Sequence, residues 1–115
     1  MRIEIKAVPP SLNKVLRMHW AKRYKLRDSW LLYILTQIAG KPHLRPLVRM
    51  EATITLHHSR LYDKDNAYGA SKVVVDALKY YRLIMDDTPQ YLSLTVKQEK
   101  AKRKDGKTVI ELVPA

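Results

Sequence analysis

Four stretches of the chain alternate apolar and polar residues with a period of two, the pattern of strands that bury one face. They cover residues 2–7, 49–57, 92–96 and 108–113. In the second of them the inward-facing side chains are predicted to be Met50, Ala52, Ile54 and Leu56. Pro9 and Pro10 end the first strand, because proline cannot donate a ladder hydrogen bond. Asp105-Gly106 between the last two strands is typical of a tight hairpin, so these two are predicted to pair.

Two further stretches repeat apolar residues every three to four positions, the period of an amphipathic helix. The first helix is predicted over 21–39, ends at Gly40 and Pro42, and has the stripe Leu26, Trp30, Leu31, Ile34, Leu35 and Ile38. The second begins near Asp65 or Asn66, and one of its faces carries Ala67, Ala70, Ser71, Val74, Val75, Leu78 and Tyr81. Residues 11–20 lack a clean period and are predicted to be irregular. Loops are predicted at 41–47 and 86–89.

The resulting order, β-α-β-α-β-β, predicts an α+β fold in which helices pack on a mixed sheet. A length of 115 residues suits one domain, 1–115, and 46% hydrophobic residues allow a packed core. The chain has no cysteine, which excludes disulfides and thiolate metal sites. No stretch approaches the roughly 20 apolar residues that span a bilayer, and residues 1–8 do not resemble a signal peptide. We therefore expect a cytoplasmic protein that does not bind membranes.

Charge sharpens this picture, because 22 Lys and Arg residues face only 11 acids and give a net charge of +11. Such a field attracts polyanions, of which nucleic acid is the commonest. The bland alternative is a soluble protein that merely has a basic surface. The acids are unevenly placed, however, since five of the 11 lie between Asp63 and Asp87. Gathering the few carboxylates of a basic chain in one region indicates a shared role.

Asp63 and Asp65 stand two residues apart at the end of a predicted strand, where extended backbone points both side chains to one side. A divalent cation relieves the repulsion between two such carboxylates and takes oxygen ligands. Asp87 could supply a third carboxylate from its loop, which makes Mg²⁺ the candidate metal. The structural alternatives are that Asp65 is a helix N-cap and that Asp86 or Asp87 only starts a turn.

Lys72 follows Asp65 by seven residues, which is about two helical turns. It could therefore stand beside the carboxylates and contact phosphate or stabilise a developing negative charge. Its structural alternative is a surface ion pair with Asp76 at i, i+4.

Adjacent histidines raise zinc as a second metal, and with it a zinc-dependent hydrolase. Zinc sites take three or four protein ligands, mostly His or Cys. His57 and His58 supply two of them, whereas His19 and His43 are distant in sequence. The number of ligands disfavours zinc.

Two groups of residues form a more specific pattern when they are taken in order. The first is Pro9-Pro10-Ser11-Leu12-Asn13, followed by the basic stretch from Arg17 to Arg27. The second is Asp63-Lys64-Asp65-Asn66, then Lys72, Asp76-Ala77-Leu78 and Asp86-Asp87. Together they resemble the RusA family of phage and prophage Holliday-junction resolvases, over nearly the whole chain. The chain departs from the family at Ala67, where leucine is common, at Tyr62, where the residue can be basic, and in the spacing from Asn66 to Lys72, which is longer than in some members.

The resemblance implies a magnesium-dependent endonuclease, with Mn²⁺ as an alternative cofactor, that cuts four-way DNA junctions during recombination and repair. It implies a homodimer with two active sites, in the cytoplasm of a bacterium or a phage-infected cell. It assigns metal-binding and catalytic roles to Asp63, Asp65 and Asp87, and a supporting catalytic role to Lys72. Asp86 receives no definite role.

Basic and polar residues of two segments are the candidates to hold the DNA arms through phosphate contacts, which position DNA without reading its sequence. They are Asn13, Arg17, Lys22, Arg23, Lys25, Lys100, Lys102 and Arg103. For the dimer interface the candidates are Tyr80, Tyr81 and Leu83, expected to be exposed near the end of the second helix. The alternative function is a non-catalytic basic DNA-binding phage protein, which explains the charge but not the gathered acids.

Overall fold

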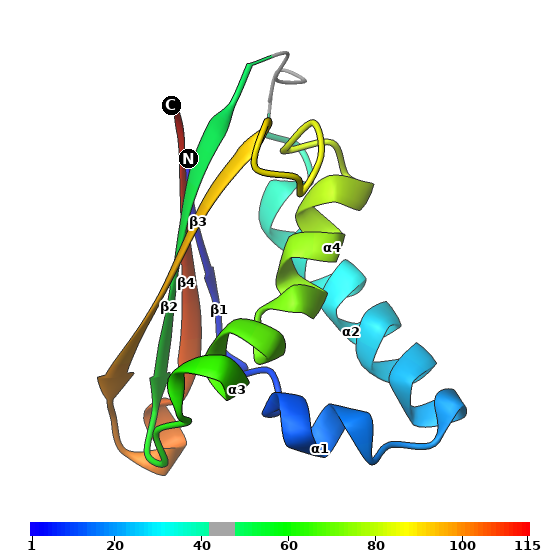
Figure 1. Ribbon diagram of the computed structural model, residues 1–115, viewed down its shortest axis with the longest axis vertical. Helices are drawn as coiled ribbons and strands as arrows, with labels where there is room; N and C mark the ends of the chain where they lie inside the picture. The colour runs from blue at the N-terminus through cyan, green and yellow to red at the C-terminus, as the bar shows by residue number, and fades with distance from the viewer. Residues whose placement is uncertain (42–47) are drawn as a thin grey trace.

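Four strands form one mixed sheet in the computed structural model, which describes residues 1–41 and 48–115 (Figure 1). The strands are β1 (Arg2–Ile5), β2 (Met50–His58), β3 (Leu92–Lys100) and β4 (Lys107–Pro114). Across the sheet their order is β1-β4-β2-β3. β4 is antiparallel to β1 and to β2, whereas β2 and β3 are parallel. The predicted α+β class with a mixed sheet is confirmed.

The predicted hairpin at Asp105-Gly106 is wrong, because β2 lies between β3 and β4. A two-residue hairpin of this composition needs positive φ, but Gly106 has a φ of −59° and Asp105 ends a short 3₁₀ helix, η1 (Arg103–Asp105). The connection instead crosses the end of β2, where the N–H of Ala101 donates to the carbonyl oxygen of His58 (3.0 Å). A local turn signal cannot reveal that β2 pairs on both of its edges.

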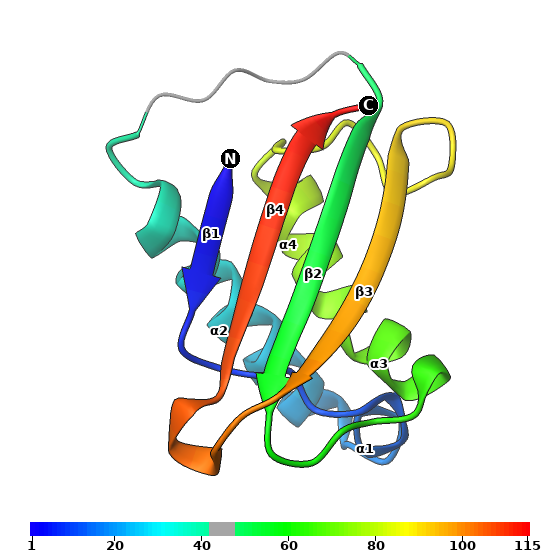
Figure 2. The same cartoon turned by 90° about the vertical axis from the view of Figure 1, so that its left-hand side faces the viewer.

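The helices cover one face of the sheet and leave the other face open, as Figures 1 and 2 show. They are α1 (Leu12–Leu16), α2 (Trp20–Ile38), α3 (Lys64–Ala70) and α4 (Lys72–Tyr80). The helix predicted over 21–39 is confirmed as α2, displaced by one residue at each end. Its stripe needs one correction, since Leu35 is 42% exposed while Trp30, Ile34 and Ile38 are buried.

The prediction that residues 11–20 are irregular is wrong in part, because α1 forms there. The side chain of Ser11 caps α1 by accepting a hydrogen bond from the N–H of Lys14 (3.3 Å). No residue of α1 is fully buried. The apolar positions Leu12, Val15 and Leu16 cover only five residues, which is too short a stretch for periodicity to predict a helix.

The second predicted helix is two helices, α3 and α4, which meet at Ser71. The buried hydroxyl of Ser71 donates to the carbonyl oxygen of Ala67, four residues earlier (3.1 Å). Such a side-chain bond competes with the backbone bonds of a helix and bends it. The break redirects α4 along α2, against which it packs (Figure 1).

The core lies between the covered face of the sheet and helices α2 and α4. Its fully buried residues include Trp30, Ile34, Ile54, Leu56, Val74, Leu78, Ile84 and Ile110. The predicted inward face of β2 is confirmed, with Ala52, Ile54 and Leu56 buried and Met50 partly buried. Apart from Lys41, the loop predicted at 41–47 lies outside the described residues. Within residues 1–41 and 48–115, none of the helices has the length and apolar character needed to cross a membrane.

Candidate carboxylate site and nucleic-acid interface

The two segments that carry the resemblance contact each other where α1 meets α3. The side-chain oxygen Oδ1 of Asn66 accepts a hydrogen bond from the backbone N–H of Asn13 (2.9 Å), across 53 residues of sequence. The hydroxyl of Tyr62 donates to the carbonyl oxygen of Pro9 (2.9 Å), across the same separation. Residues that are remote in the sequence therefore form one local unit at the start of α3.

Gly69 allows this close approach of α1 to α3. A Cβ atom added at Gly69 would lie 2.5 Å from the Cβ of Leu12, a distance that side chains do not tolerate. Glycine is needed at this position because it has no side chain, and any side chain would keep the two helices apart.

Asp63 is the N-cap of α3, and both of its carboxylate oxygens bond to Asn66. Oδ1 accepts from the backbone N–H of Asn66 and Oδ2 accepts from its side-chain Nδ2, each at 2.9 Å. These bonds, the backbone one first, hold the pKa of the Asp63 carboxyl below its usual value although the side chain is exposed. The alternative that Asp65 is the N-cap is wrong. Asp65 lies exposed in the first turn, and its carboxylate has no hydrogen-bond or ion-pair partner in residues 1–41 and 48–115.

Lys72 and Asp87 line one pocket of about 430 Å³ beside β3, the edge strand of the sheet. The other lining residues are Tyr68, Val75, Pro89, Leu92 and Leu94. The hydroxyl of Tyr68 accepts a hydrogen bond from the N–H of Val96 (3.3 Å) and so covers part of the free edge of β3. Lys72 also forms the i, i+4 ion pair with Asp76 (3.2 Å) that the sequence offered as the alternative to a catalytic role.

Lys79 is the residue that holds the aspartates of the loop after α4, and sequence reasoning missed it. Its Nζ lies 3.0 Å from Oδ1 of Asp86 and 3.8 Å from Oδ1 of Asp87. The hydrogen bond from Lys79 lowers the pKa of Asp86, and the same bond raises the pKa of Lys79. Oδ1 of Asp86 also accepts from the backbone N–H of Asp87 (2.8 Å). Asp86, which had no definite role, therefore bonds within its own loop.

The predicted metal ligands are oxygen donors of the kind that Mg²⁺ prefers, but they are not gathered into one ligand set. Among the described residues, no three His, Asp or Glu side chains form a group that could hold a metal. This applies to Asp63, Asp65 and Asp87, and equally to His19, His57 and His58. His58 is buried and bonded to Gln98 (2.9 Å), and His43 lies outside the described residues.

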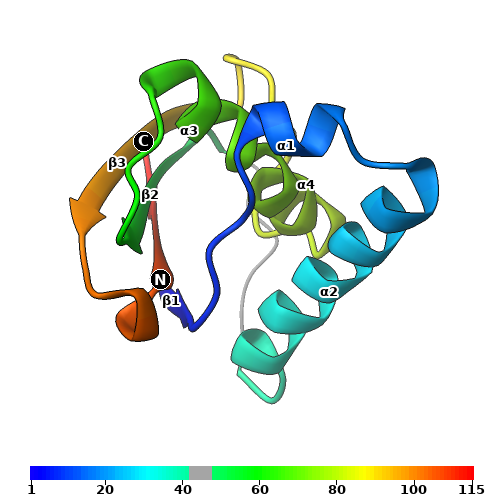
Figure 3. The same ribbon diagram turned by 90° about the horizontal axis from the view of Figure 1, so that it is seen from below.

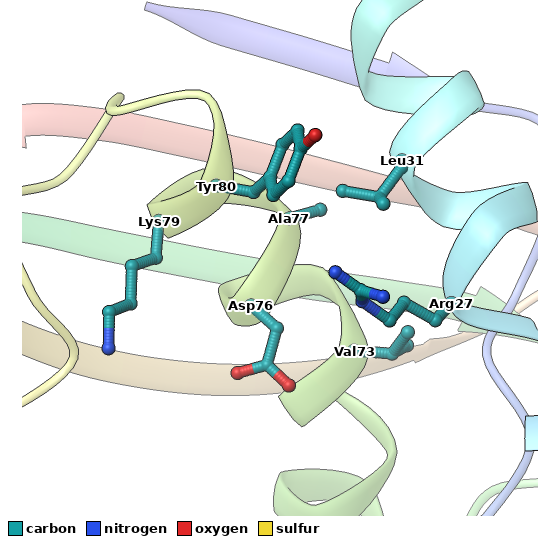
Figure 4. Close-up of a pocket in the computed structure, with 7 residues that line it drawn as sticks. All are labelled: Arg27, Leu31, Val73, Asp76, Ala77, Lys79 and Tyr80. Carbon is teal, nitrogen blue, oxygen red and sulfur yellow. The ribbon is translucent and has the colours of Figure 1, made fainter. Parts of the chain in front are cut away.

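A second pocket, of about 390 Å³, lies between α2 and α4 (Figure 4). Arg27 of α2 reaches toward α4 there, and Tyr80 lies at the rim with 59% of its surface exposed. The expectation that Tyr81 and Leu83 are exposed as well is wrong. Tyr81 is partly buried and donates to the carbonyl oxygen of Leu31 (2.8 Å), and Leu83 is only 4% exposed, because the chain turns back into the core after α4.

All eight candidate DNA-binding residues are exposed, on α1 or directly after it, at the start of α2, at the end of β3 and in the β3–β4 connection. Figure 1 shows α1, the start of α2 and η1 at the same end of the molecule, where β2 and β3 also end. One end of the protein therefore carries both basic segments. Of these residues, Arg23 donates from Nη2 to the carbonyl oxygen of Leu16 (3.0 Å), which fixes its position on the α1–α2 turn.

Two exposed aromatic residues stand among these cations and were not singled out from the sequence. Trp20 is 66% exposed and Tyr24 is 58% exposed. Their rings meet edge to face with centroids 6.1 Å apart, and the ring of His19 lies 5.4 Å from that of Trp20. The signal was available, because the stretch from Arg17 to Lys25 interleaves aromatic and basic residues.

Comparison of the chain with protein-family models and with curated proteins finds no match.

Proposed function

We propose that this protein is a Mg²⁺-dependent endodeoxyribonuclease that cuts four-way DNA junctions, with Mn²⁺ able to replace Mg²⁺. The observation that carries the proposal is the side chain of Asn66, which bonds to Asp63 and to the backbone of Asn13 at the same time. It joins the two segments of the resemblance into one unit. The proposed setting is the cytoplasm of a bacterium or of a phage-infected cell.

The proposed catalytic residues divide into carboxylates and one cation. Asp63, Asp65 and Asp87 supply the negative charge, and Lys72 contacts phosphate from the pocket that it shares with Asp87. Asp65 is the carboxylate most available for chemistry, since it has no partner in the described part of the chain. In the described residues the three carboxylates are not gathered into one ligand set, so they do not form a complete metal site as they stand.

DNA would be held by the end of the molecule that carries α1, the start of α2 and η1. Phosphate contacts by its cations would position the arms. Trp20 and Tyr24 would add a stacking surface for bases that are unpaired at the branch, because base–aromatic stacking is worth about 1–3 kcal/mol per base. Each junction needs two cuts in strands of like polarity, so the proposal includes a two-fold dimer, the commonest soluble oligomer.

Cleavage of three matched substrates tests this proposal. Four-way, three-way and linear DNA of the same sequence are incubated with the protein, with Mg²⁺ and with EDTA. We expect paired cuts in the four-way junction that depend on Mg²⁺, and a supercoiled cruciform plasmid should become linear in one binding event. Failure to cleave any of these DNAs with Mg²⁺ or Mn²⁺ would sink the nuclease proposal.

Light scattering tests the dimer separately. A mass about twice that of one chain is expected at micromolar concentration. A monomer that only nicks the plasmid would exclude a resolvase but leave a simpler branched-DNA nuclease.

A non-catalytic DNA-binding protein is the second candidate, and three contacts favour it. Asp63 caps a helix, Lys72 pairs with Asp76, and Lys79 holds Asp86. In each case a residue that belongs to the family resemblance makes a contact that stabilises the fold. Both candidates predict DNA binding that weakens with salt, with a slope of about −0.9 in log K against log salt per neutralised phosphate. Cleavage decides between them.

A further inference from the structure

A cavity of about 790 Å³ lies at the end of the molecule where β2 ends, on the side covered by α1. Four separate segments line it: the linker after β1, α1, the exit from β2, and η1 with the residue that follows it. Figure 3 views this end directly and places α1, η1 and the β1–α1 linker around it. The cavity is the largest of the five pockets described in residues 1–41 and 48–115.

Five cations line this cavity, and no carboxylate does. They are Lys6, Lys14, Arg60, Arg103 and Lys104. None of them has an ion-pair partner in the part of the chain that the structure describes. A neighbouring pocket that shares Lys6 and Lys104 with the cavity is lined by two acids, Glu4 and Asp105. Bringing unpaired like charges together raises the free energy of the protein, and a bound anion would lower it.

The inner wall of the cavity is held by hydrogen bonds. Nε2 of His58 bonds to Oε1 of Gln98 (2.9 Å), and the backbone N–H of Tyr62 donates to the same oxygen (2.8 Å). Nε2 of Gln98 donates back to the carbonyl oxygen of Tyr62 (2.9 Å). The rings of His58 and Tyr62 then meet edge to face, with centroids 4.6 Å apart. A site held in this way loses little entropy when a ligand binds.

We propose that this cavity binds the phosphodiester backbone of a DNA strand and guides that strand to the carboxylates. The inference rests on the proposed function for its DNA substrate, and it names a binding site that the sequence did not indicate. Of its five cations, only Arg103 was among the candidate DNA-binding residues. A strand in the cavity would lie against Tyr62, which directly precedes Asp63, so its next phosphates would reach the start of α3. The volume and the spread of cations over four segments suit several phosphates of one strand.

Two double variants of equal charge test the cavity. Lys14→Gln with Arg60→Gln removes two cavity cations, whose side chains make no hydrogen bond or ion pair in the described structure. Arg2→Gln with Arg82→Gln removes two exposed cations outside every described pocket and serves as the control. Binding to a labelled four-way junction is measured by anisotropy in EDTA, over a series of salt concentrations, and circular dichroism checks that both variants fold.

The cavity variant should bind the junction at least about tenfold more weakly than the wild type at 0.15 M salt, and its salt slope should fall by about two. The control should stay near the wild type. Equal losses in the two variants, or an unchanged slope in the cavity variant, would overturn the cavity as a site. Since EDTA prevents metal-dependent cleavage, this result is independent of the nuclease assay. A protein that binds DNA through the cavity but never cuts it would disprove the proposed function alone.

A titration with the dinucleotide dTpdT gives a second readout by NMR. The amide signals of His58, Tyr62 and Lys14 and the ring signals of His58 and Tyr62 should shift, and equal concentrations of inorganic phosphate should shift them less. Shifts confined to α2, or equally large shifts with phosphate, would overturn the assignment to a DNA strand.

Discussion

Two pairs of aspartates lie at opposite ends of the α3–α4 unit, and in both pairs the two members differ in their bonding. At the start of α3, Asp63 accepts two hydrogen bonds from Asn66, while the carboxylate of Asp65 has no partner in the described residues. After α4, Asp86 takes Lys79 at 3.0 Å, while Asp87 lies 3.8 Å from it and lines the pocket with Lys72. In each pair one aspartate accepts the short hydrogen bonds that tie it to the fold, and the other has at most a longer ion pair. The comparison makes Asp65 and Asp87 the most informative residues for chemistry.

The largest effect is expected from Asp65→Asn. The substitution removes a charge that has no hydrogen-bond or ion-pair partner in the described structure, so stability should fall only slightly, through the lost interaction with the N-terminus of α3. Under the proposed function, cleavage of a four-way junction should fall by about 100-fold or more, the scale of losing a group that transfers protons or stabilises charge. Junction binding should stay equal or become tighter, because one repulsive carboxylate is gone. Single-turnover cleavage and anisotropy measure the two quantities.

Loss of cleavage together with loss of the folded circular dichroism spectrum would instead make Asp65 a structural residue. Full cleavage by the folded variant would remove Asp65 from the site and favour the non-catalytic candidate.

Comparing the cleavage rates of Asp87→Asn and Asp86→Asn distinguishes the roles of the two aspartates in the second pair. We expect Asp87→Asn to lose cleavage by about 10-fold to 100-fold, because Asp87 shares its pocket with Lys72. Asp86→Asn should keep most of its activity, since Asp86 interacts with Lys79 and with its own loop. Both variants lose one negative charge, so each is the control for the other. Equal cleavage rates for the two variants would show that Asp86 and Asp87 do not have different roles.

Much of the frame could be predicted from the sequence, because periodicity reports burial. β1, β2, β4 and the second half of α2 bury one face, and β3 is partly buried; all were placed within a few residues. α1 spans only five residues and fully buries none of them, so its signal was too short to predict a helix. The order of β3, β2 and β4 depends on pairings that join distant segments, and the local signal of Asp105-Gly106 was overridden by them.

The site was predictable in composition but not in arrangement. Both Asp63 and Asp65 are residues that helix N-caps prefer. Asp63 is the N-cap, and its bonding partner Asn66 also contacts Asn13, 53 residues away in the sequence. Lys79 gave no signal at all, because its contact with Asp86 exists only after the chain reverses at the end of α4. Contacts that form only in the folded chain therefore decide which aspartate is bonded within the fold.

A smaller effect, on stability, is expected from Asp63. Asp63→Ala should lower the thermal unfolding midpoint at pH 7, whereas Asp63→Asn should keep it near the wild type, since asparagine caps helices as well as aspartate. The pKa of Asp63 is lowered in the folded protein, so its carboxylate stabilises the fold above the unfolded pKa, and this contribution is lost as pH falls through the lowered value. The difference between wild type and Asp63→Ala should therefore shrink below about pH 4.

Cleavage separates the two roles of Asp63. The proposal expects both variants to cut DNA more slowly, because both lose the charge. If Asp63→Asn cuts as fast as the wild type, Asp63 is only a helix cap, and any catalytic role in the first pair belongs to Asp65. An equal loss of stability in the two variants would contradict the cap.

The smallest effect concerns Arg82, which begins the loop that carries the second pair. Leu83 donates its N–H to the carbonyl oxygen of Leu78 (2.9 Å) and Arg82 donates to that of Lys79 (3.0 Å), the two bonds of a Schellman motif that ends α4. This motif places Arg82 at a φ of 59°, the position at which glycine is preferred. Relief of the left-handed strain is worth about 1 kcal/mol, and the greater freedom of glycine in the unfolded chain offsets about half of it. Arg82→Gly should therefore stabilise the protein by about 0.5 kcal/mol.

Urea unfolding measures this gain as a higher midpoint at an unchanged slope. Arg82→Ala is the matched control, because it removes the same charge and keeps the strain, so it should give no gain. Cleavage should be unaffected in both variants if Asp87 depends only on the motif that ends α4, which glycine preserves. A stabilised Arg82→Gly protein with reduced cleavage would mean that the loop must move for the second pair to work, and that the strain at Arg82 serves this movement.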